Sequence, residues 1–134
     1  MKKIVILYGL LLTGNFGLLV QESPLQKSME RGKAVYEDFC VTCHLPDGKG
    51  VEGVFPPLSG SDFLLNKREE SLRAIKFGQQ GEITVNGKTY NSIMAPMGLS
   101  DEEVADVMNY ILNSWGNTSK ERVTAEEVAE LKPR

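Results

Sequence analysis

The sequence predicts an all-α domain of three to four short helices joined by long loops rich in glycine and proline. Helix-capping signals are followed by apolar residues at spacings of three and four, the pattern of one buried helix face. Extended residues are confined to a short stretch around Asn86-Gly87, which is too small for a sheet domain. The chain of 134 residues has room for one domain of ordinary size.

Composition and charge exclude several classes of protein. Hydrophobic residues make up 41% of the chain and charged residues 25%. Both values are close to those of soluble globular proteins, so a disordered or collagen-like chain is excluded. The formal net charge is −3. Because nucleic-acid phosphates are bound by clustered lysine and arginine, we expect no nucleic-acid partner.

The N-terminal segment has the pattern of an export signal. Lys2 and Lys3 precede a mostly apolar run over residues 4–20, which is typical of a secretory signal peptide. The run is also at the lower limit of ~17 residues for a membrane span, so a retained anchor is the alternative. Removal of Lys2 and Lys3 from the 15 basic residues leaves 13 against 18 acidic residues, a net charge of −5.

A first helix is predicted over residues 24–41. Ser23 is the expected N-cap, Pro24 takes the first helical position, and Gln26 lies three residues after the cap. One face of this helix carries apolar and small residues, namely Met29, Gly32, Tyr36, Phe39, Cys40 and Cys43. The last turn would therefore deliver both cysteines.

The middle of the chain is expected to be irregular. Residues 45–62 are rich in glycine and proline and predict a loop. A second helix is predicted over residues 67–76 and ends at Gly78. The Asn86-Gly87 turn between residues 83 and 90 predicts a short hairpin.

The clearest helix begins at Ser100, where Glu103 completes a capping box. Its apolar stripe is continuous and consists of Val104, Val107, Met108, Ile111, Leu112 and Trp115. Gly116 is expected to end it. The acids Asp101, Glu102, Glu103 and Asp106 are expected to be solvated near the helix start. A last short helix, capped at Thr124, is predicted over residues 125–132.

Both cysteines and the only histidine form one motif, Cys40-Val-Thr-Cys43-His44. Cys-x-x-Cys-His is the attachment signature of c-type haem. Two thiols one helical turn apart reach the two vinyl groups of one porphyrin and form thioethers, and the adjacent His44 places a nitrogen on the iron. A central cofactor would also supply core that short helices with long loops otherwise lack.

Other interpretations of the motif fit less well. Structural zinc needs four ligands, and the chain has no further cysteine or histidine. A thioredoxin-like redox pair opens a helix, whereas these cysteines close one. A disulfide between residues three apart is rare. We therefore expect one covalently attached haem c.

The sixth ligand of the iron is narrowed by elimination to two methionines. A second histidine is excluded because the chain has only one, and methionine is the common alternative. Met1 is the initiator, Met29 lies on the first helix, and Met108 belongs to the apolar stripe. Met94 and Met97 remain, both in the loop before the last strong helix, and spacing alone barely separates them.

The sequence resembles class I cytochromes c over roughly residues 27–116. The resemblance is carried by the cysteine–histidine motif, Phe55-Pro56-Pro57-Leu58, Tyr90-Asn-Ser-Ile-Met94-Ala-Pro-Met97, and the helix from Leu99 to Ile111, in that order. It implies the cytochrome c fold, with three to four short helices around a covalently attached haem. The chain then divides into a signal peptide or anchor at residues 1–20, a cytochrome c domain at 21–116, and a C-terminal extension with a short helix at 117–134.

The same resemblance implies roles for single residues. Cys40 and Cys43 would attach the haem, and His44 and Met94 would be the axial ligands. Met97 is kept as the alternative axial ligand.

Further roles follow from the same family pattern. Pro56, with Pro57 as its neighbour, matches the proline whose carbonyl accepts a hydrogen bond from the axial histidine. Gly32 and Tyr36 match the positions where the first helix crosses the last helix at Tyr110.

The expected function is electron transfer by a periplasmic or otherwise extracytoplasmic carrier that is not itself an enzyme. A six-coordinate iron that cycles between Fe(III) and Fe(II) leaves no open position for a substrate. The expected partners are redox proteins, namely an oxidase, reductase or dehydrogenase. The carrier itself is expected to be a monomer. The negative charge favours a basic patch on the partner, and membrane contact is expected only if residues 1–20 are retained.

Two alternatives remain. The chain could be the haem subunit of an oxidoreductase complex, to which the extension at 117–134 could dock, although its apolar positions could equally fold back on the domain. An open-site, peroxidase-like or ligand-binding haem protein would need the methionine to be absent or displaced.

Overall fold

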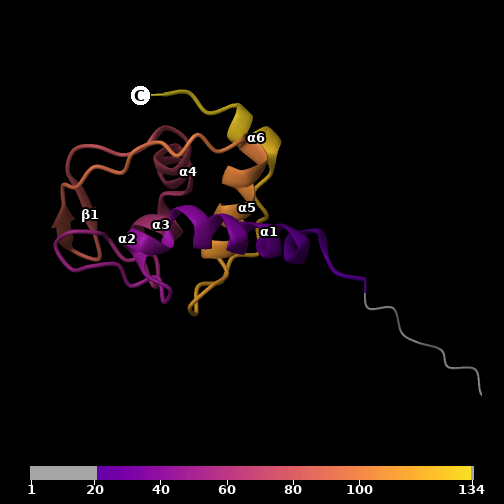
Figure 1. Ribbon diagram of the computed structural model, residues 1–134, viewed down its shortest axis with the longest axis horizontal. Coiled ribbons are helices and arrows are strands. Elements are labelled where there is room, and N and C mark those ends of the chain that lie inside the picture. Colours follow the sequence, from indigo (N-terminus) through magenta and orange to yellow (C-terminus); the bar gives the residue numbers. More distant parts are fainter. Residues whose placement is uncertain (1–20, 134) are drawn as a thin grey trace, which may run out of the picture.

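A computed structural model describes residues 21–133, and the predicted signal peptide or anchor lies outside this range. The described part contains six helices and one hairpin (Figure 1). In chain order they are α1 (Pro24–Phe39), α2 (Val41–His44), α3 (Asp62–Asn66), α4 (Arg68–Phe77), β1 (Ile83–Val85), β2 (Lys88–Tyr90), α5 (Asp101–Ile111) and α6 (Ala125–Ala129). Within residues 21–133, no helix has the length and apolarity that a membrane crossing requires.

Helix α1 starts as predicted but ends earlier. Ser23 Oγ accepts a hydrogen bond from the Gln26 amide at 3.2 Å, and the Gln26 side chain accepts one from the Ser23 amide at 2.8 Å. The helix is interrupted at Cys40, where φ is −113°, and a separate turn, α2, carries Cys43 and His44. Cys40 therefore follows the last turn of α1, whereas Cys43 lies in α2. The prediction that the last turn of one helix carries both cysteines was wrong.

The middle of the chain contains one helix that the sequence did not predict. Ser61 Oγ, at the end of the expected loop, caps α3 by accepting from the Leu64 amide at 3.1 Å, and α3 fills the stretch before the predicted second helix. Helix α4 ends at Gly78, whose φ is 83°, as predicted. Strands β1 and β2 pair antiparallel around Asn86-Gly87, both at positive φ, so the predicted hairpin is confirmed.

The two C-terminal helices begin at their predicted caps and end early. Ser100 and Glu103 form the capping box of α5, and Thr124 Oγ1 accepts from the Glu127 amide at 3.3 Å. Helix α5 stops at Ile111 and α6 at Ala129. Trp115 has a φ of 53°, outside helical geometry, so the prediction that Gly116 ends the helix was wrong.

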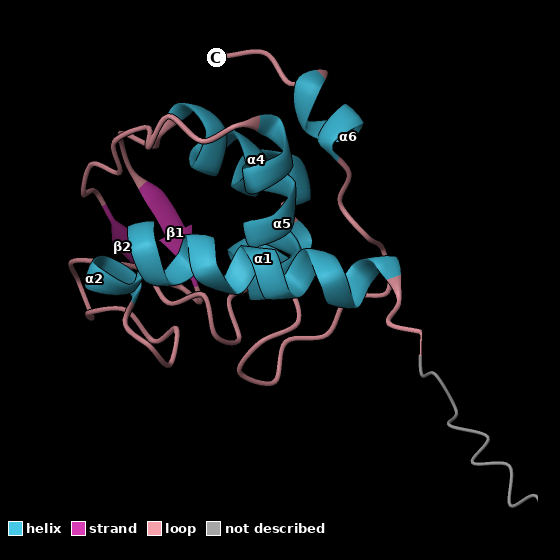
Figure 2. Cartoon of the chain, turned by 45° about the vertical axis from the view of Figure 1, so that its right-hand side comes forward, coloured by secondary structure: helices cyan, strands magenta, loops and turns pink. Residues whose placement is uncertain are grey.

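The core forms where α1 crosses α5 (Figures 1 and 2). Gly32 makes the close crossing possible, because a Cβ at this position would lie 1.9 Å from the Asp106 carbonyl oxygen. One turn further along α1, the Tyr36 ring lies 5.5 Å from that of Tyr110. Met108 is fully buried in this core, which confirms its predicted packing role.

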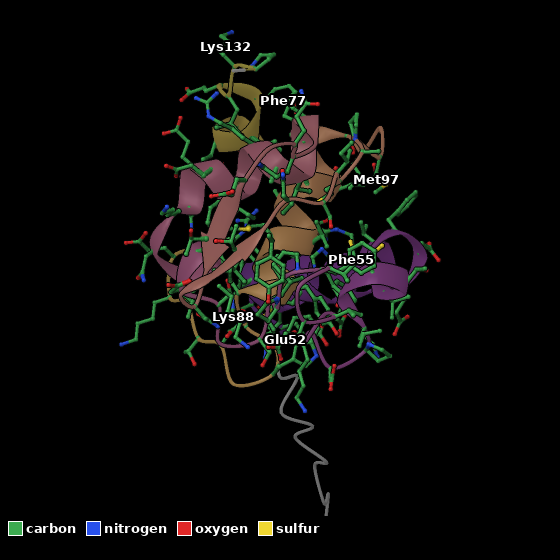
Figure 3. The ribbon with its side chains drawn as sticks, turned by 90° about the vertical axis from the view of Figure 1, so that its left-hand side faces the viewer. Glu52, Phe55, Phe77, Lys88, Met97 and Lys132 are labelled. Carbon is green, nitrogen blue, oxygen red and sulfur yellow. The ribbon has the colours of Figure 1, made fainter. Side chains whose placement is uncertain are left out.

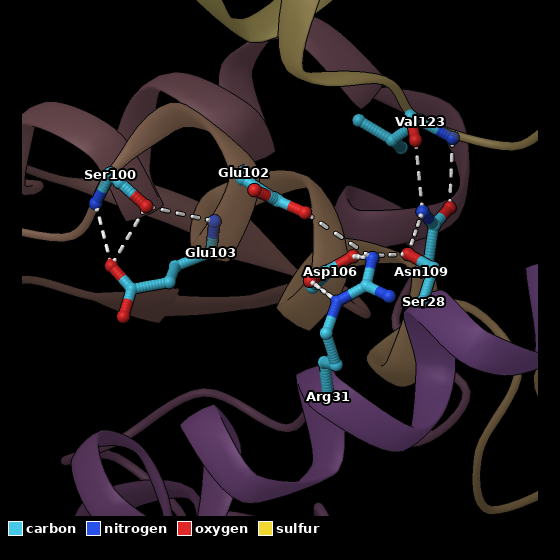
Figure 4. Close-up of polar contacts among 8 residues, drawn as sticks. All are labelled: Ser28, Arg31, Ser100, Glu102, Glu103, Asp106, Asn109 and Val123. Carbon is cyan, nitrogen blue, oxygen red and sulfur yellow. Dashed lines mark hydrogen bonds and ion pairs between the residues drawn. The ribbon is translucent and has the colours of Figure 1, made fainter.

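A buried polar network joins α1 to α5 beside the crossing (Figure 4). Asp106 is only 4% exposed and accepts from Ser28 Oγ at 2.6 Å and from Arg31 Nε at 2.6 Å. The prediction that Asp106 is solvated was therefore wrong. Buried polar groups are found with partners because an unpaired one is costly, and here the partners come from the facing helix.

The C-terminal extension folds back onto the domain. Asn109 Nδ2 donates to the Val123 carbonyl at 2.9 Å, and the Val123 amide donates to Asn109 Oδ1 at 2.8 Å (Figure 4). Val123 and Val128 are buried. Arg68 of α4 forms a two-pronged ion pair with Glu127 at 2.7 and 2.8 Å. The apolar positions of the extension are thus used within the domain.

Replacement of Gly32 tests the close crossing of α1 and α5. Gly32→Ala is expected to lower the free energy of unfolding by about 1–3 kcal/mol, because overpacking outweighs the helix propensity gained. Urea unfolding of the haem-loaded protein measures this. Ala34→Leu, on the exposed side of α1, is the control and should change stability by less than about 0.5 kcal/mol. Equal stability of Gly32→Ala and wild type would contradict the crossing.

The Arg68–Glu127 pair makes a pH-dependent contribution to stability. Arg68 lowers the pKa of the Glu127 carboxyl, chiefly through its side-chain hydrogen bonds. This contribution is present above the unfolded-state pKa of Glu127 and is lost as the pH falls through the lower folded-state pKa. Glu127→Gln should therefore cost up to about 1 kcal/mol at pH 7 and progressively less in acid. A stability difference that stays constant from pH 7 to pH 3 would contradict this assignment.

Candidate haem-binding site

One apolar cavity of about 340 Å³ lies between the helices and the hairpin. Every helix of the described residues except α6 contributes to its wall, together with both strands and the loops at 55–58 and 92–97. Its size is that of a ligand pocket. The wall contains no lysine, arginine, aspartate or glutamate, so a bound group is held in a low-polarity environment.

The two cysteines and the histidine of the motif all line this cavity. Cys40 and Cys43 are half-buried free thiols. Burial raises the pKa of the Cys40 thiol to about 11, so this thiol is protonated at neutral pH. The interruption between α1 and α2 does not separate the two cysteines, because the Cys43 amide still bonds to the Cys40 carbonyl at 3.2 Å.

The imidazole of His44 is buried and oriented by one carbonyl. Nδ1 lies 3.0 Å from the carbonyl oxygen of Pro56. When Nδ1 carries the proton it donates this bond, which leaves Nε2 free to bind a metal. Burial lowers the pKa of His44 and the bond to Pro56 partly opposes that shift, so the neutral ring is favoured. The carbonyl belongs to Pro56 rather than to its neighbour Pro57.

Met94 and Met97 both line the cavity, but their surroundings differ. The Met94 amide and carbonyl each bond to Gln79, at 2.8 Å. Gly78 lies close behind, where a Cβ would be 2.6 Å from the Met94 carbonyl oxygen. Met97 is 36% exposed and lies on the same side of the molecule as Phe55 (Figure 3). The fixed backbone favours Met94 as a ligand.

The residues present fit a covalently bound haem. Two free thiols suit the two thioether links of a c-type haem, and a neutral imidazole and a methionine sulfur suit His/Met ligation of its iron. All four groups line one apolar space. Tyr90, at the end of β2, is buried and lines the cavity. Trp115 lies outside it and packs on Tyr36, with ring centroids 5.1 Å apart.

One contact at the edge of the site was missed by the sequence analysis. Asn117 bonds to the backbone of residues 58 and 60, close to Pro56. The sequence contains no signal for such a distant contact, because an asparagine that follows a helix is typical of a turn.

A small α-helical domain in which a Cys-x-x-Cys-His motif opens onto one apolar cavity is a c-type haem protein. A family model for cytochrome c matches residues 29–115. The chain belongs to the cytochrome c family.

Several relatives are named as cytochromes c or as cytochrome c subunits of dehydrogenases. The chain is 38% identical over 112 residues to cytochrome c-552 of Thermus thermophilus, with 77% of this chain and 85% of the relative covered. It is 33% identical over 105 residues to the cytochrome c subunit of the quinone alcohol dehydrogenase of Gluconobacter oxydans, with 75% of this chain but 22% of that protein covered. It is 34% identical over 106 residues to the gluconate 2-dehydrogenase cytochrome c subunit of Pantoea cypripedii, with 77% and 24% covered.

These findings confirm the predicted class. The protein is an electron-transfer protein that binds haem c covalently, and it carries electrons rather than transforming a substrate itself.

Proposed function

We propose that the chain is a monohaem electron carrier of the periplasm or another extracytoplasmic space. Cys40 and Cys43 form the thioethers, and His44 and Met94 are the axial ligands. The haem supplies one-electron exchange between Fe(III) and Fe(II). The observation that carries the proposal is the Nδ1 of His44 at 3.0 Å from the Pro56 carbonyl, at the wall of a cavity that also receives Met94.

The residues around the cavity suit electron transfer better than bond-making chemistry. His44 is the only titratable side chain of the wall other than thiols and tyrosines, so a catalytic acid–base pair has no place there. The cavity wall is apolar, the His44 ring is oriented by the Pro56 carbonyl, and the backbone of Met94 is tied to Gln79 by two bonds. Such a site changes little on reduction.

The number of haems and the location are supported by the sequence. The chain holds one Cys-x-x-Cys-His motif and one histidine, which supports a single haem. The basic and apolar start of the chain supports export. The charge of −5 without residues 1–20 supports an encounter with a basic surface of an oxidase, reductase or dehydrogenase.

A second candidate is a haem subunit that works only inside a dehydrogenase complex. It is favoured by the relatives named as cytochrome subunits of alcohol, gluconate and fructose dehydrogenases, at 32–34% identity. The inward packing of Val123 and Val128 favours the free carrier, because the extension then has fewer apolar side chains with which to dock.

Replacement of the two loop methionines tests the axial ligation. The wild type, expressed with c-haem maturation enzymes, should show a low-spin c-type spectrum with an iron–sulfur charge-transfer band. Met94→Ala should lose this band because the sulfur is removed, and the control Met97→Ala should keep it. The opposite pattern would make Met97 the ligand. A high-spin wild type that binds carbon monoxide would overturn the electron-carrier proposal.

The state of the protein in its native host separates the two candidates. A free carrier should elute from a sizing column as a monomer, without dehydrogenase activity in the same fractions. The absorbance of c-type haem and the identity of the chain by mass spectrometry locate it. Elution at a large size together with a dehydrogenase would favour the subunit instead.

A further inference from the structure

The Pro56 carbonyl, which accepts from His44, lies in a loop at residues 55–60. None of these residues belongs to a helix or to a named strand. We call this segment the Pro56 loop. On one side its backbone is tied to Gly48, whose carbonyl accepts from the Leu58 amide at 2.7 Å and from the Ser59 amide at 2.9 Å. At its start, Phe55 is tied to Val51 by two backbone bonds of 2.8 and 2.9 Å. Further fixation comes from side chains of other segments.

Asn117 fixes the C-terminal half of this loop through its side chain. Its Nδ2 donates to the Leu58 carbonyl at 2.9 Å and to the Ile111 carbonyl at 2.9 Å. Its Oδ1 accepts from the Gly60 amide at 2.9 Å. Asn117 is only 7% exposed. One buried amide thus joins the Pro56 loop to the end of α5 by three bonds.

Trp115 fixes the same region from the Gly48 side. Its Nε1 donates to the Pro46 carbonyl at 2.9 Å. Its ring lies against Gly48, where a Cβ would be 2.4 Å from Cε3. Ser59 Oγ donates to the Trp115 carbonyl at 3.4 Å. Because Gly48 in turn accepts from the Pro56 loop, the indole holds the second anchor of that loop.

We infer that Asn117 and Trp115 are positioning residues that hold the Pro56 carbonyl against His44 Nδ1 and thereby help set the reduction potential. The inference rests on the proposed role of His44 as axial ligand. A hydrogen bond donated by Nδ1 increases the electron donation of Nε2. Stronger donation stabilises Fe(III) over Fe(II) and lowers the potential. Asn117 lies outside the residues matched by the family model.

The test compares two asparagine deletions in the haem-loaded protein. Asn117→Ala removes the bonds to the Pro56 loop. The control, Asn113→Ala, removes an amide that bonds to the Asn109 carbonyl and the Ser119 amide, each at 3.0 Å, and not to the loop. Two quantities are measured: the reduction potential, and the exchange rate of the His44 Nδ1 proton by nitrogen-15 NMR of the reduced protein.

Asn117→Ala should raise the potential and speed the exchange of the Nδ1 proton. We expect about a threefold rise in the ratio of reduced to oxidised protein at a fixed potential. A change of this size corresponds to part of the net free energy of one hydrogen bond. At ~59 mV per tenfold for one electron, this is about 30 mV. Asn113→Ala should leave both quantities at their wild-type values, even where it lowers stability.

Trp115→Phe keeps the test open if Asn117→Ala does not fold. It removes only the bond to Pro46 while an aromatic ring stays over Gly48, and it should move both quantities in the same direction by less. The inference is overturned if the folded variants keep the wild-type potential and exchange rate, or if Asn113→Ala shifts them equally. A wild type without His/Met ligation would instead overturn the proposed function.

Discussion

The backbone contact between α1 and α5 is the constraint on which the rest of the structure depends. A Cβ at Gly32 would lie 1.9 Å from the Asp106 carbonyl oxygen, so the two helices touch without side chains between them. That contact buries the Asp106 carboxylate, and Ser28 and Arg31 stabilise the carboxylate by donating hydrogen bonds to it. It also sets the position of α1 against α5, and α1 leads to Cys40 at the wall of the cavity that Val107 and Ile111 of α5 line.

Features that depend on neighbours in the chain could be predicted from the sequence. The caps at Ser23 and Ser100 and the Asn86-Gly87 turn each act over a few residues, and each is found where it was expected. The helix ends were less accurate. At Trp115 the apolar spacing continues the stripe of α5, but the indole is needed over Gly48, so tertiary packing overrides the periodic pattern.

Features that depend on distant segments could not be predicted. Asp106 looks like one of four acids at a helix start, and only its position opposite Ser28 and Arg31 explains its burial. Asn109 and Asn117 each bond to backbone far along the chain. The sequence does not indicate the partner of an asparagine, because its side chain can both donate to and accept from any backbone group nearby. The candidate ligands and the Pro56 carbonyl could be named from the sequence, but the side chains that hold the Pro56 loop could not.

The site is therefore held less by helices than by side-chain and backbone bonds between loops. His44 is oriented by the Pro56 loop, and that loop is fixed by Gly48 and Asn117. Met94 is held by two backbone bonds to Gln79 with Gly78 behind it. An electron carrier needs ligands that stay in place when the iron changes charge, because any movement adds to the barrier for transfer. These anchors would supply that rigidity to the proposed ligands, and the cavity wall holds no lysine, arginine, aspartate or glutamate.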